Sequence, residues 1–249
     1  MEWQERDGVE WLEAKLPGAT AAFSTRKGGQ SQPPYDSLNV GLLTGDALGH
    51  VRANRVRLLS AWGRDLDCVL AGYQAHETVV LRREVAPRPN PFSRTMATPP
   101  RSDGQATSSP ELTPLVQVAD CLPVMLAGDA GVAAIHCGWR GMAAGIIDRG
   151  VGEVRATAAA IGPGIGPCHY EVGDEVLAEF ADLGDGIADG NRLDLVAVAR
   201  RLLERAGVTQ VEAAGLCTSC EADLFYSHRR DGSRSGRQAG AVWANPVDG

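Results

Sequence analysis

Short apolar runs rich in alanine, valine, leucine and isoleucine recur along the chain, between stretches in which apolar residues return every three or four positions. The first pattern is typical of buried strands and the second of amphipathic helices. Within residues 46–63, Val51 and Leu58 fall with other apolar side chains on one side of a helix, opposite several arginines. Strands are predicted at 20–25, 68–73, 115–119, 122–126, 132–135, 156–161 and 211–216, and helices at 46–63, 141–154, 174–180 and 193–206.

The alternation of these strands and helices predicts an α/β fold. We expect a single-domain layered sandwich over residues 1–249 with a mixed central β-sheet. One segment departs from the pattern, because residues 84–114 hold seven prolines among many serines, threonines and arginines. Little apolar periodicity remains there, so we predict a Pro-rich surface loop rather than a linker between domains.

Composition and charge restrict the class of protein. Hydrophobic residues make up 44% and charged residues 22% of the 249 positions, which is ordinary for a globular chain. The net charge of −7 argues against a general nucleic-acid-binding surface. Residues 1–17 are polar and lack the apolar core of a signal peptide, and no stretch approaches the length of a transmembrane helix. We therefore expect a cytoplasmic protein with neither nucleic acid nor membrane as a partner.

The sequence from Cys121 to His136 is the first candidate for chemistry. Two apolar runs flank the short connection Ala-Gly-Asp-Ala-Gly, which is typical of a β-hairpin. A turn centred on Gly128 and Asp129 places Cys121 directly opposite His136, where facing Cβ atoms lie about 5 Å apart. The pair could act as nucleophile and base, or as two ligands of one metal. Pro123 suggests an edge or irregular strand, and Cys121 taken alone is compatible with a buried apolar residue.

His76 is the candidate for a third ligand. It follows the predicted strand 68–73, and strand ends are where α/β folds display functional side chains. Catalytic zinc sites commonly use three protein ligands and leave a fourth position open for water or substrate. A His-Cys-His site made of His76, Cys121 and His136 fits that description. A zinc ion there would lower the pKa of bound water toward about 7.

Three further motifs carry weaker signals. The segment 136–141 could bind an anion through its glycines, the following helix and Arg140, or could simply form a tight turn around a buried Trp139. The Gly- and Pro-rich segment 162–170 lacks the dinucleotide-binding fingerprint. Cys217 and Cys220 form a lone CxxC without an evident second ligand pair, so we expect a structural role for them at the end of a late strand.

Taken together, seven motifs in order between Phe23 and Trp243 resemble the YfiH/YlmD-like family. Members are known as polyphenol oxidoreductase or laccase-domain proteins and are now regarded as purine nucleoside phosphorylases. The motifs are Phe23-Ser24-Thr25-Arg26-Lys27-Gly28-Gly29, Tyr35-Asp36-Ser37-Leu38-Asn39-Val40-Gly41, Gln74-Ala75-His76, Ala119-Asp120-Cys121-Leu122-Pro123-Val124, His136-Cys137-Gly138-Trp139-Arg140-Gly141, Gly162-Pro163-Gly164-Ile165-Gly166, and Arg229-Arg230-Asp231-Gly232 with Gly236-Arg237-Gln238.

The resemblance implies a YfiH-like fold related to the catalytic fold of cytotoxic necrotizing factor. It implies zinc, with copper as a further metal, at His76, Cys121 and His136, of which Cys121 and His136 are also the expected catalytic residues. The implied reactions are phosphorolysis of adenosine, inosine, guanosine and S-methyl-5'-thioadenosine, and deamination of adenosine. Purine nucleosides and phosphate are then the partners, and the candidate substrate-binding residues are Arg26, Asn39 and Arg140.

The sequence departs from the family pattern at several positions, none of which is an expected metal ligand. Ala75, Cys137 and Glu221 replace the valine, alanine and asparagine that the resemblance leads us to expect, and the segment before Asp103 is longer and richer in proline. Two other activities stay open, a metal-free Cys-His hydrolase or amidase and a copper-dependent polyphenol oxidoreductase. Five histidines in the whole chain are too few for a laccase-type multicopper centre.

Overall fold

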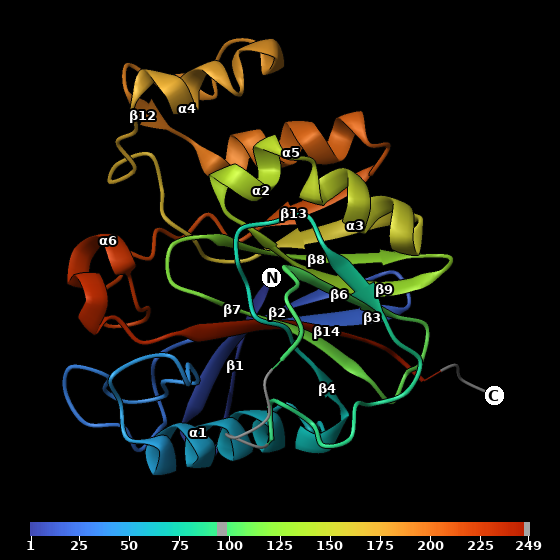
Figure 1. Cartoon of the computed structure of the whole chain (residues 1–249), viewed down its shortest axis with the longest axis vertical. Helices are drawn as coiled ribbons and strands as arrows, with labels where there is room; N and C mark the ends of the chain where they lie inside the picture. The colour runs from blue at the N-terminus through green and yellow to red at the C-terminus, as the bar shows by residue number, and fades with distance from the viewer. Residues whose placement is uncertain (94–98, 247–249) are drawn as a thin grey trace.

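The computed structural model describes residues 1–93 and 99–246, which form two β-sheets stacked face to face between helices (Figure 1). The first sheet has the order β1-β2-β3-β14-β7-β4, and all its neighbours are antiparallel except β4 and β7. Its strands are β1 (Glu2–Arg6), β2 (Val9–Leu16), β3 (Ala19–Ser24), β14 (Gln238–Ala244), β7 (Thr113–Val118) and β4 (Val69–Leu70).

The second sheet has the order β13-β10-β8-β9-β6-β5. Its two outer pairs, β10 with β13 and β5 with β6, are parallel, and the inner pairs are antiparallel. Its strands are β13 (Gln210–Ala213), β10 (Ala156–Ile161), β8 (Leu122–Gly128), β9 (Gly131–Cys137), β6 (Gly104–Thr107) and β5 (Val80–Arg82). A small ribbon joins β11 (Ala188–Asp189) to β12 (Arg192–Leu193).

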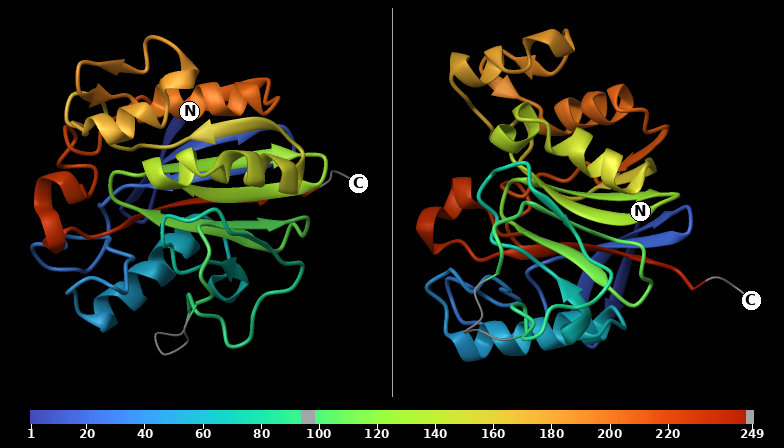
Figure 2. Two further views of the ribbon diagram at one scale, coloured as in Figure 1. Left: turned by 45° about the horizontal axis from the view of Figure 1, so that its top comes forward. Right: turned by 45° about the vertical axis from the view of Figure 1, so that its right-hand side comes forward.

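Helices cover the outer face of each sheet (Figure 2). On the first sheet lies α1, and on the second lie α3 and α5, with α2 beside them. None of the helices in residues 1–93 and 99–246 is long and apolar enough to cross a membrane. The helices are α1 (Leu48–Ala61), α2 (Trp139–Ala143), α3 (Ile146–Val154), α4 (Asp174–Ala178), α5 (Leu195–Arg205) and α6 (His228–Asp231), with short 3-10 turns η1 (Leu66–Cys68), η2 (Ala181–Leu183) and η3 (Gly232–Arg234).

Three apolar clusters lie between the four layers of the fold, which are α1, the first sheet, the second sheet and the helices on its outer face. Strand β2 contributes side chains to two of these clusters. Successive side chains of a strand point to opposite faces. Val9 and Trp11 accordingly pack toward α1, whereas Leu12 and Ala14 pack between the two sheets. The third layer lies between the second sheet and the helices α3 and α5. Small alanines dominate the facing strands, which agrees with the low aromatic content of 5%.

The predicted α/β class with mixed strand directions is confirmed, but the strands form two sheets rather than one central sheet. The predicted loop 84–114 is also only partly a loop. Residues 104–107 form the fully buried strand β6, and β7 begins at Thr113. The four residues Gly-Gln-Ala-Thr show no apolar pattern, so this strand could not be predicted from the sequence. Residues 94–98 of the predicted loop lie outside the described residues.

The predicted hairpin is confirmed as β8 and β9, with a different register. Its turn holds Asp129 and Ala130, so His136 pairs with Pro123 instead of Cys121. The shift is two residues, and because strand side chains alternate with a period of two, Cys121 keeps the predicted face. The expectation that Pro123 marks an edge is wrong, since β8 lies between β10 and β9. Pro123 is the second residue of β8, where the strand has only just begun.

Candidate functional site

The structure brings His76, Cys121 and His136 together, each from a different part of the fold. Their ligand atoms all lie within 4.8 Å of one another, and Cys121 Sγ is 3.7 Å from His76 Nε2. His76 is exposed, Cys121 is half-buried and His136 is buried. The cluster therefore has one side closed by protein and one side open toward solvent.

Cys121 lies where the chain passes from one sheet to the other, between β7 and β8. The preceding residue, Asp120, has a positive φ of 89°, which is uncommon outside glycine and here turns the chain sharply. Its carboxylate accepts hydrogen bonds from the Thr218 hydroxyl at 2.7 Å and from the Arg229 backbone N–H at 2.6 Å. Asp120 thereby fixes the turn that presents the Cys121 thiol.

Asp103 at the start of β6 holds both histidines, and the sequence did not identify it as a site residue. Its buried carboxylate accepts backbone N–H bonds from Ala75, His76 and Glu77 at 2.9–3.0 Å. These bonds stabilise the left-handed backbone of His76, whose φ is 61°. Asp103 Oδ1 also lies 2.8 Å from His136 Nδ1. With Nδ1 donating to this carboxylate, His136 presents Nε2 as its free nitrogen.

The electrostatics of the cluster favour a thiolate beside charged or metal-bound imidazoles. Burial by itself raises the pKa of Cys121, but the positive charge and hydrogen bonding of His136 and His76 outweigh it and lower that pKa to about 6. Burial likewise raises the pKa of Asp103, and the hydrogen bonds from His136 and the backbone N–H groups bring it below its usual range. One thiolate, two imidazoles and a buried carboxylate behind them are a donor set that suits zinc.

The separation between Cys121 and His76 also suits a metal. Zinc–ligand bonds of 2.0–2.3 Å in a tetrahedron put ligand atoms about 3.3–3.8 Å apart, and the 3.7 Å between Cys121 Sγ and His76 Nε2 falls in this range. Gly138 leaves room for the cluster, because a Cβ there would lie 2.8 Å from His76 Cδ2 and 3.1 Å from Cys121 Sγ. The absence of a side chain at Gly138 therefore allows His76 and Cys121 to approach each other closely.

The three candidate substrate-binding residues have different surroundings. Arg140 is exposed, its guanidinium lies 4.3 Å above the Trp139 ring, and within the described residues it forms no hydrogen bond with the protein. Arg26 donates to the backbone oxygens of Asp36 and Ala222. Asn39 is fully buried and uses its amide to join Thr44, Asp46, Gly41 and Arg237. Of the three, Arg140 is the one with a free cationic group.

Tyr170 is a second residue near the cluster that the sequence did not identify. Burial and the charge of Cys121 raise its pKa to about 12, while Arg229, whose guanidinium lies 5.3 Å from the ring centre, acts in the opposite direction. The tyrosine is the last residue of the Gly- and Pro-rich segment 162–170. Nothing in the local pattern distinguishes this tyrosine from one that packs in the core.

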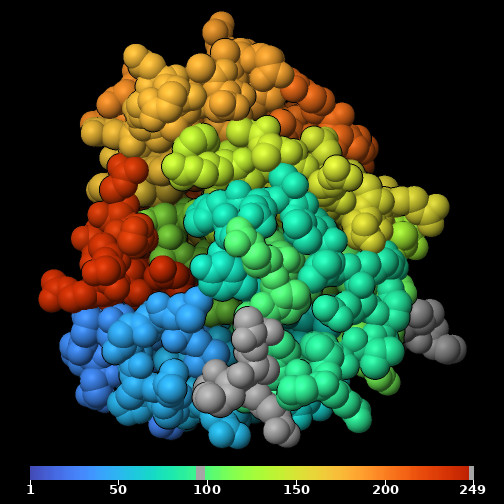
Figure 3. Space-filling model, viewed as in Figure 1, coloured from blue at the N-terminus to red at the C-terminus, as the bar shows by residue number. Residues whose placement is uncertain are grey.

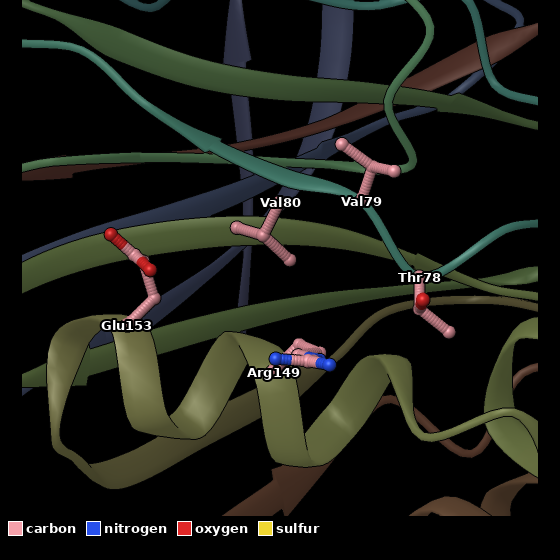
Figure 4. A pocket seen from close by; sticks show the side chains of 5 residues that line it. All are labelled: Thr78, Val79, Val80, Arg149 and Glu153. Carbon is pink, nitrogen blue, oxygen red and sulfur yellow. The ribbon is translucent and has the colours of Figure 1, made fainter.

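The molecular surface is hollowed on the face shown in Figure 3, between the C-terminal segment in red and the segment in teal. Green atoms from the middle of the chain form the floor of this hollow. A separate pocket of about 290 Å³ lies between β5 and α3 and is lined by Thr78, Val79, Val80, Arg149 and Glu153 (Figure 4). His76, Cys121 and His136 do not line that pocket.

The expectation that Cys217 and Cys220 lack further partners is wrong. Cys168 and His169 lie against them, and the ligand atoms of all four residues lie within 4.8 Å of one another. The partners come from a loop about 50 residues earlier in the chain, so the spacing of the CxxC alone could not reveal them.

Comparisons with known proteins agree with this architecture. A family model described as "Multi-copper polyphenol oxidoreductase laccase" matches residues 20–245. Purine nucleoside phosphorylase YfiH from Escherichia coli is 36% identical over 247 residues, covering 94% of this chain and 96% of the relative. Purine nucleoside phosphorylase YlmD from Geobacillus stearothermophilus is 34% identical over 257 residues, covering 94% of each.

Solved structures agree as well. YlmD from Geobacillus stearothermophilus superposes with a TM-score of 0.89 at 31% identity, covering 98% of each chain. A hypothetical protein YfiH from Bacillus licheniformis gives a TM-score of 0.87 at 32% identity, covering 98% of this chain and 99% of the other. With the family model, the relatives and the folds in agreement over nearly the whole length, the chain belongs to the YfiH/YlmD family of laccase-domain proteins.

Proposed function

We propose that this protein is a zinc-dependent purine nucleoside phosphorylase that acts on adenosine, inosine, guanosine and S-methyl-5'-thioadenosine, with adenosine deamination as a second activity. The observation that carries the proposal is the cluster of His76, Cys121 and His136, open on one side and backed by Asp103. The printed names of the relatives, purine nucleoside phosphorylase, supply the substrate class.

The three side chains would hold the zinc, and Asp103 would orient both histidines toward it. A zinc ion bound there would supply a Lewis acid and lower the pKa of a bound water. Asp120 keeps the Cys121 thiol aimed at the same point through its bonds to Thr218 and Arg229. Three protein ligands leave a fourth position for water or substrate, which is the arrangement of catalytic rather than structural zinc sites.

Arg140 is the residue we assign to phosphate. Its exposed guanidinium can form two parallel hydrogen bonds to one phosphate group. In phosphorolysis a phosphate oxygen forms a bond to the anomeric carbon of the sugar, while the bond from that carbon to the purine nitrogen breaks and its electron pair leaves with the purine. Positive charge develops on the sugar ring, and a phosphate held by Arg140 beside it stabilises that charge.

Product analysis tests the proposal directly. Protein of measured zinc content is incubated with adenosine and phosphate, and the products are separated by chromatography. Adenine with ribose 1-phosphate supports phosphorolysis, and inosine with ammonia supports deamination. Neither product, in protein that carries one zinc at the cluster, would overturn the proposed function.

Two cysteine variants test whether the cluster of His76, Cys121 and His136 is responsible for both activities. Cys121→Ala is expected to lose the zinc of the cluster and both activities. Cys68→Ser is the matched control, because Cys68 lies in η1 and belongs to neither group of clustered ligands. Full turnover in Cys121→Ala would refute the assignment of the site.

A metal-free Cys-His hydrolase is the second candidate, and the approach of the Cys121 thiol to His76 at 3.7 Å favours it. It predicts covalent trapping of Cys121 by a thiol-directed substrate analogue in protein from which zinc has been removed. Copper-dependent phenol oxidation has less support here, because five histidines in the sequence cannot ligate a multicopper centre.

A further inference from the structure

We propose that Cys168, His169, Cys217 and Cys220 bind a second zinc ion, which joins two loops beside the first cluster and has a structural role. The proposal does not depend on the phosphorylase assignment, since it concerns a different set of residues. These four residues are called the loop cluster below.

The loop cluster has the geometry of a four-ligand zinc site. His169 Nδ1 lies 3.3 Å from Cys168 Sγ, 3.4 Å from Cys220 Sγ and 3.9 Å from Cys217 Sγ, and the sulfurs of Cys168 and Cys220 are 3.4 Å apart. A tetrahedral zinc site with sulfur and nitrogen ligands requires separations of about 3.3–3.8 Å. Three of the four distances fall in this range, and the 3.9 Å from Cys217 lies just above it. All four ligand atoms lie within 4.8 Å of one another, whereas a disulfide would use only two of them.

The order of the strands explains why the two halves of the loop cluster meet. β10 and β13 pair in parallel, so the segments that follow them leave the same end of the sheet. Gly164 and Cys217 continue this pairing as a parallel bridge, and the Thr218 backbone N–H donates to the Gly164 oxygen at 2.9 Å. The backbone has therefore already aligned the two loops.

The backbone stabilises a thiolate at Cys217, and a nearby guanidinium lies where it can offset the charge of the loop cluster. The Gly166 N–H donates to Cys217 Sγ at 3.2 Å, which is a typical contact of a metal-bound thiolate. Three thiolates and a neutral histidine around Zn²⁺ carry a net charge of −1. The Arg229 guanidinium, which donates to the His169 backbone oxygen at 3.2 Å, lies where it offsets that charge.

The loop cluster connects to the first cluster through Thr218. This residue lies between the two cysteines of the CxxC, and its hydroxyl donates to Asp120 next to Cys121. Zinc at the loop cluster would hold Thr218 and hence the turn that presents Cys121.

Zinc content measured by mass spectrometry on full-length protein, purified with a reductant and without chelators, tests the proposal. Wild-type protein is expected to hold two zinc ions per chain, and Cys217→Ser/Cys220→Ser to hold one. Cys121→Ala is expected to hold one, and the combination of all three substitutions none. The control Cys68→Ser should keep two.

Replacing zinc by Co²⁺ distinguishes which site is lost. Sulfur-to-cobalt charge-transfer absorption scales with the number of thiolates, so the loop cluster should give about three times the absorption of the first cluster. Cys217→Ser/Cys220→Ser should therefore lose most of this absorption, and Cys121→Ala only a minor part. If the double variant does not fold by circular dichroism, Cys168→Ser is measured in its place with the same expected loss.

Two results would overturn the proposal. One is a wild-type zinc content of one that stays unchanged in Cys217→Ser/Cys220→Ser. The other is a disulfide between Cys168 and Cys220 that persists in reductant, detected as a mass lower by two hydrogens, in protein that binds a single metal ion.

Discussion

At the scale of single residues, the candidate site depends most on Asp103, whose side chain is fully buried. One carboxylate accepts four hydrogen bonds, three from the backbone around His76 and one from the His136 ring. It therefore couples the position of the exposed His76 to the tautomer of the buried His136. Removing one acceptor oxygen from the Asp103 carboxylate therefore affects His76 and His136 together.

Asp103→Asn is expected to weaken zinc binding at the first cluster about 10–100-fold, the usual effect of losing an outer-shell partner. The new amide NH₂ must face either the backbone N–H groups or the His136 ring, so one donor meets another donor. Titration against a chromophoric chelator measures the change in affinity, with the exposed Asp148→Asn as control. Unchanged affinity in Asp103→Asn would show that the carboxylate does not orient the ligands.

Gly138→Ala tests the space around the ligands. The added methyl group would lie 2.8 Å from the His76 ring and 3.1 Å from Cys121 Sγ, so both ligands must move. We expect loss of zinc from the first cluster and at least a 10-fold loss of turnover, because displacements near 1 Å have such effects at active sites. Gly49→Ala, where a Cβ meets nothing within 4 Å, is the matched control and should retain both.

The sequence could predict His76, Cys121 and His136 because each lies at a strand end or on a hairpin, where local patterns are informative. Asp103 could not be predicted, since its importance comes from contacts with residues 75–77 and 136, and the short polar strand β6 that follows it gives no signal. The same applies to Cys168 and His169, which meet the CxxC only through the parallel pairing of β10 and β13.

At the scale of elements, helices were predicted better than strand pairing. The predicted helix 46–63 is α1, and 193–206 is α5, with Asp194 as its N-cap. The predicted helix 141–154 is interrupted at Gly145, which has a φ of 94°, and becomes α2 and α3. Glycine adopts this conformation without a steric penalty. A segment with continuous helical periodicity can therefore form two helices when it contains a glycine.

Helix α3 offers a matched pair of glycines. A Cβ on Gly150 would lie 2.9 Å from Leu126 Cδ1 and 3.0 Å from Ile135 Cγ2 on the sheet beneath, whereas a Cβ on Gly152 meets nothing within 4 Å. Gly152→Ala should raise the free energy of unfolding by about 1 kcal/mol through helix propensity. Gly150→Ala gains the same propensity but overpacks the interface, at a cost of about 1–3 kcal/mol.

We therefore expect Gly150→Ala to be less stable than Gly152→Ala by about 2 kcal/mol in urea unfolding. Equal stability of the two variants would mean that α3 can move away from the sheet without penalty.

At the scale of the whole molecule, the two-sheet arrangement could not be predicted from sequence patterns. β14 lies between β3 and β7, although more than 200 residues separate it from β3. Nothing in either local pattern specifies that partner. Successive side chains of a strand point to opposite faces, but which face is covered by which layer is known only once the strand pairing is known. Trp11 and Leu12, for example, are neighbours in β2 and pack in different apolar layers.

In this arrangement the apolar core and the proposed zinc ligands lie in different parts of the molecule. The three apolar layers extend along both sheets, while the proposed zinc ligands lie in loops and at strand ends on one side of them. In small zinc domains the metal replaces a core, and its removal unfolds the chain. Here the core exists without the metal, so removing zinc should leave the fold intact.

Chelation is therefore expected to abolish turnover while leaving the far-UV and near-UV circular dichroism close to that of the zinc-bound protein. Bound zinc still adds stability by mass action, about 2.7 kcal/mol for each site when free zinc is 100 times its Kd. For a chain of this size that corresponds to a fall in Tm of about 5–10 °C per site on zinc removal. Cooperative unfolding on chelation at 25 °C would contradict this view, because it would make the metal sites part of the core that folds the protein.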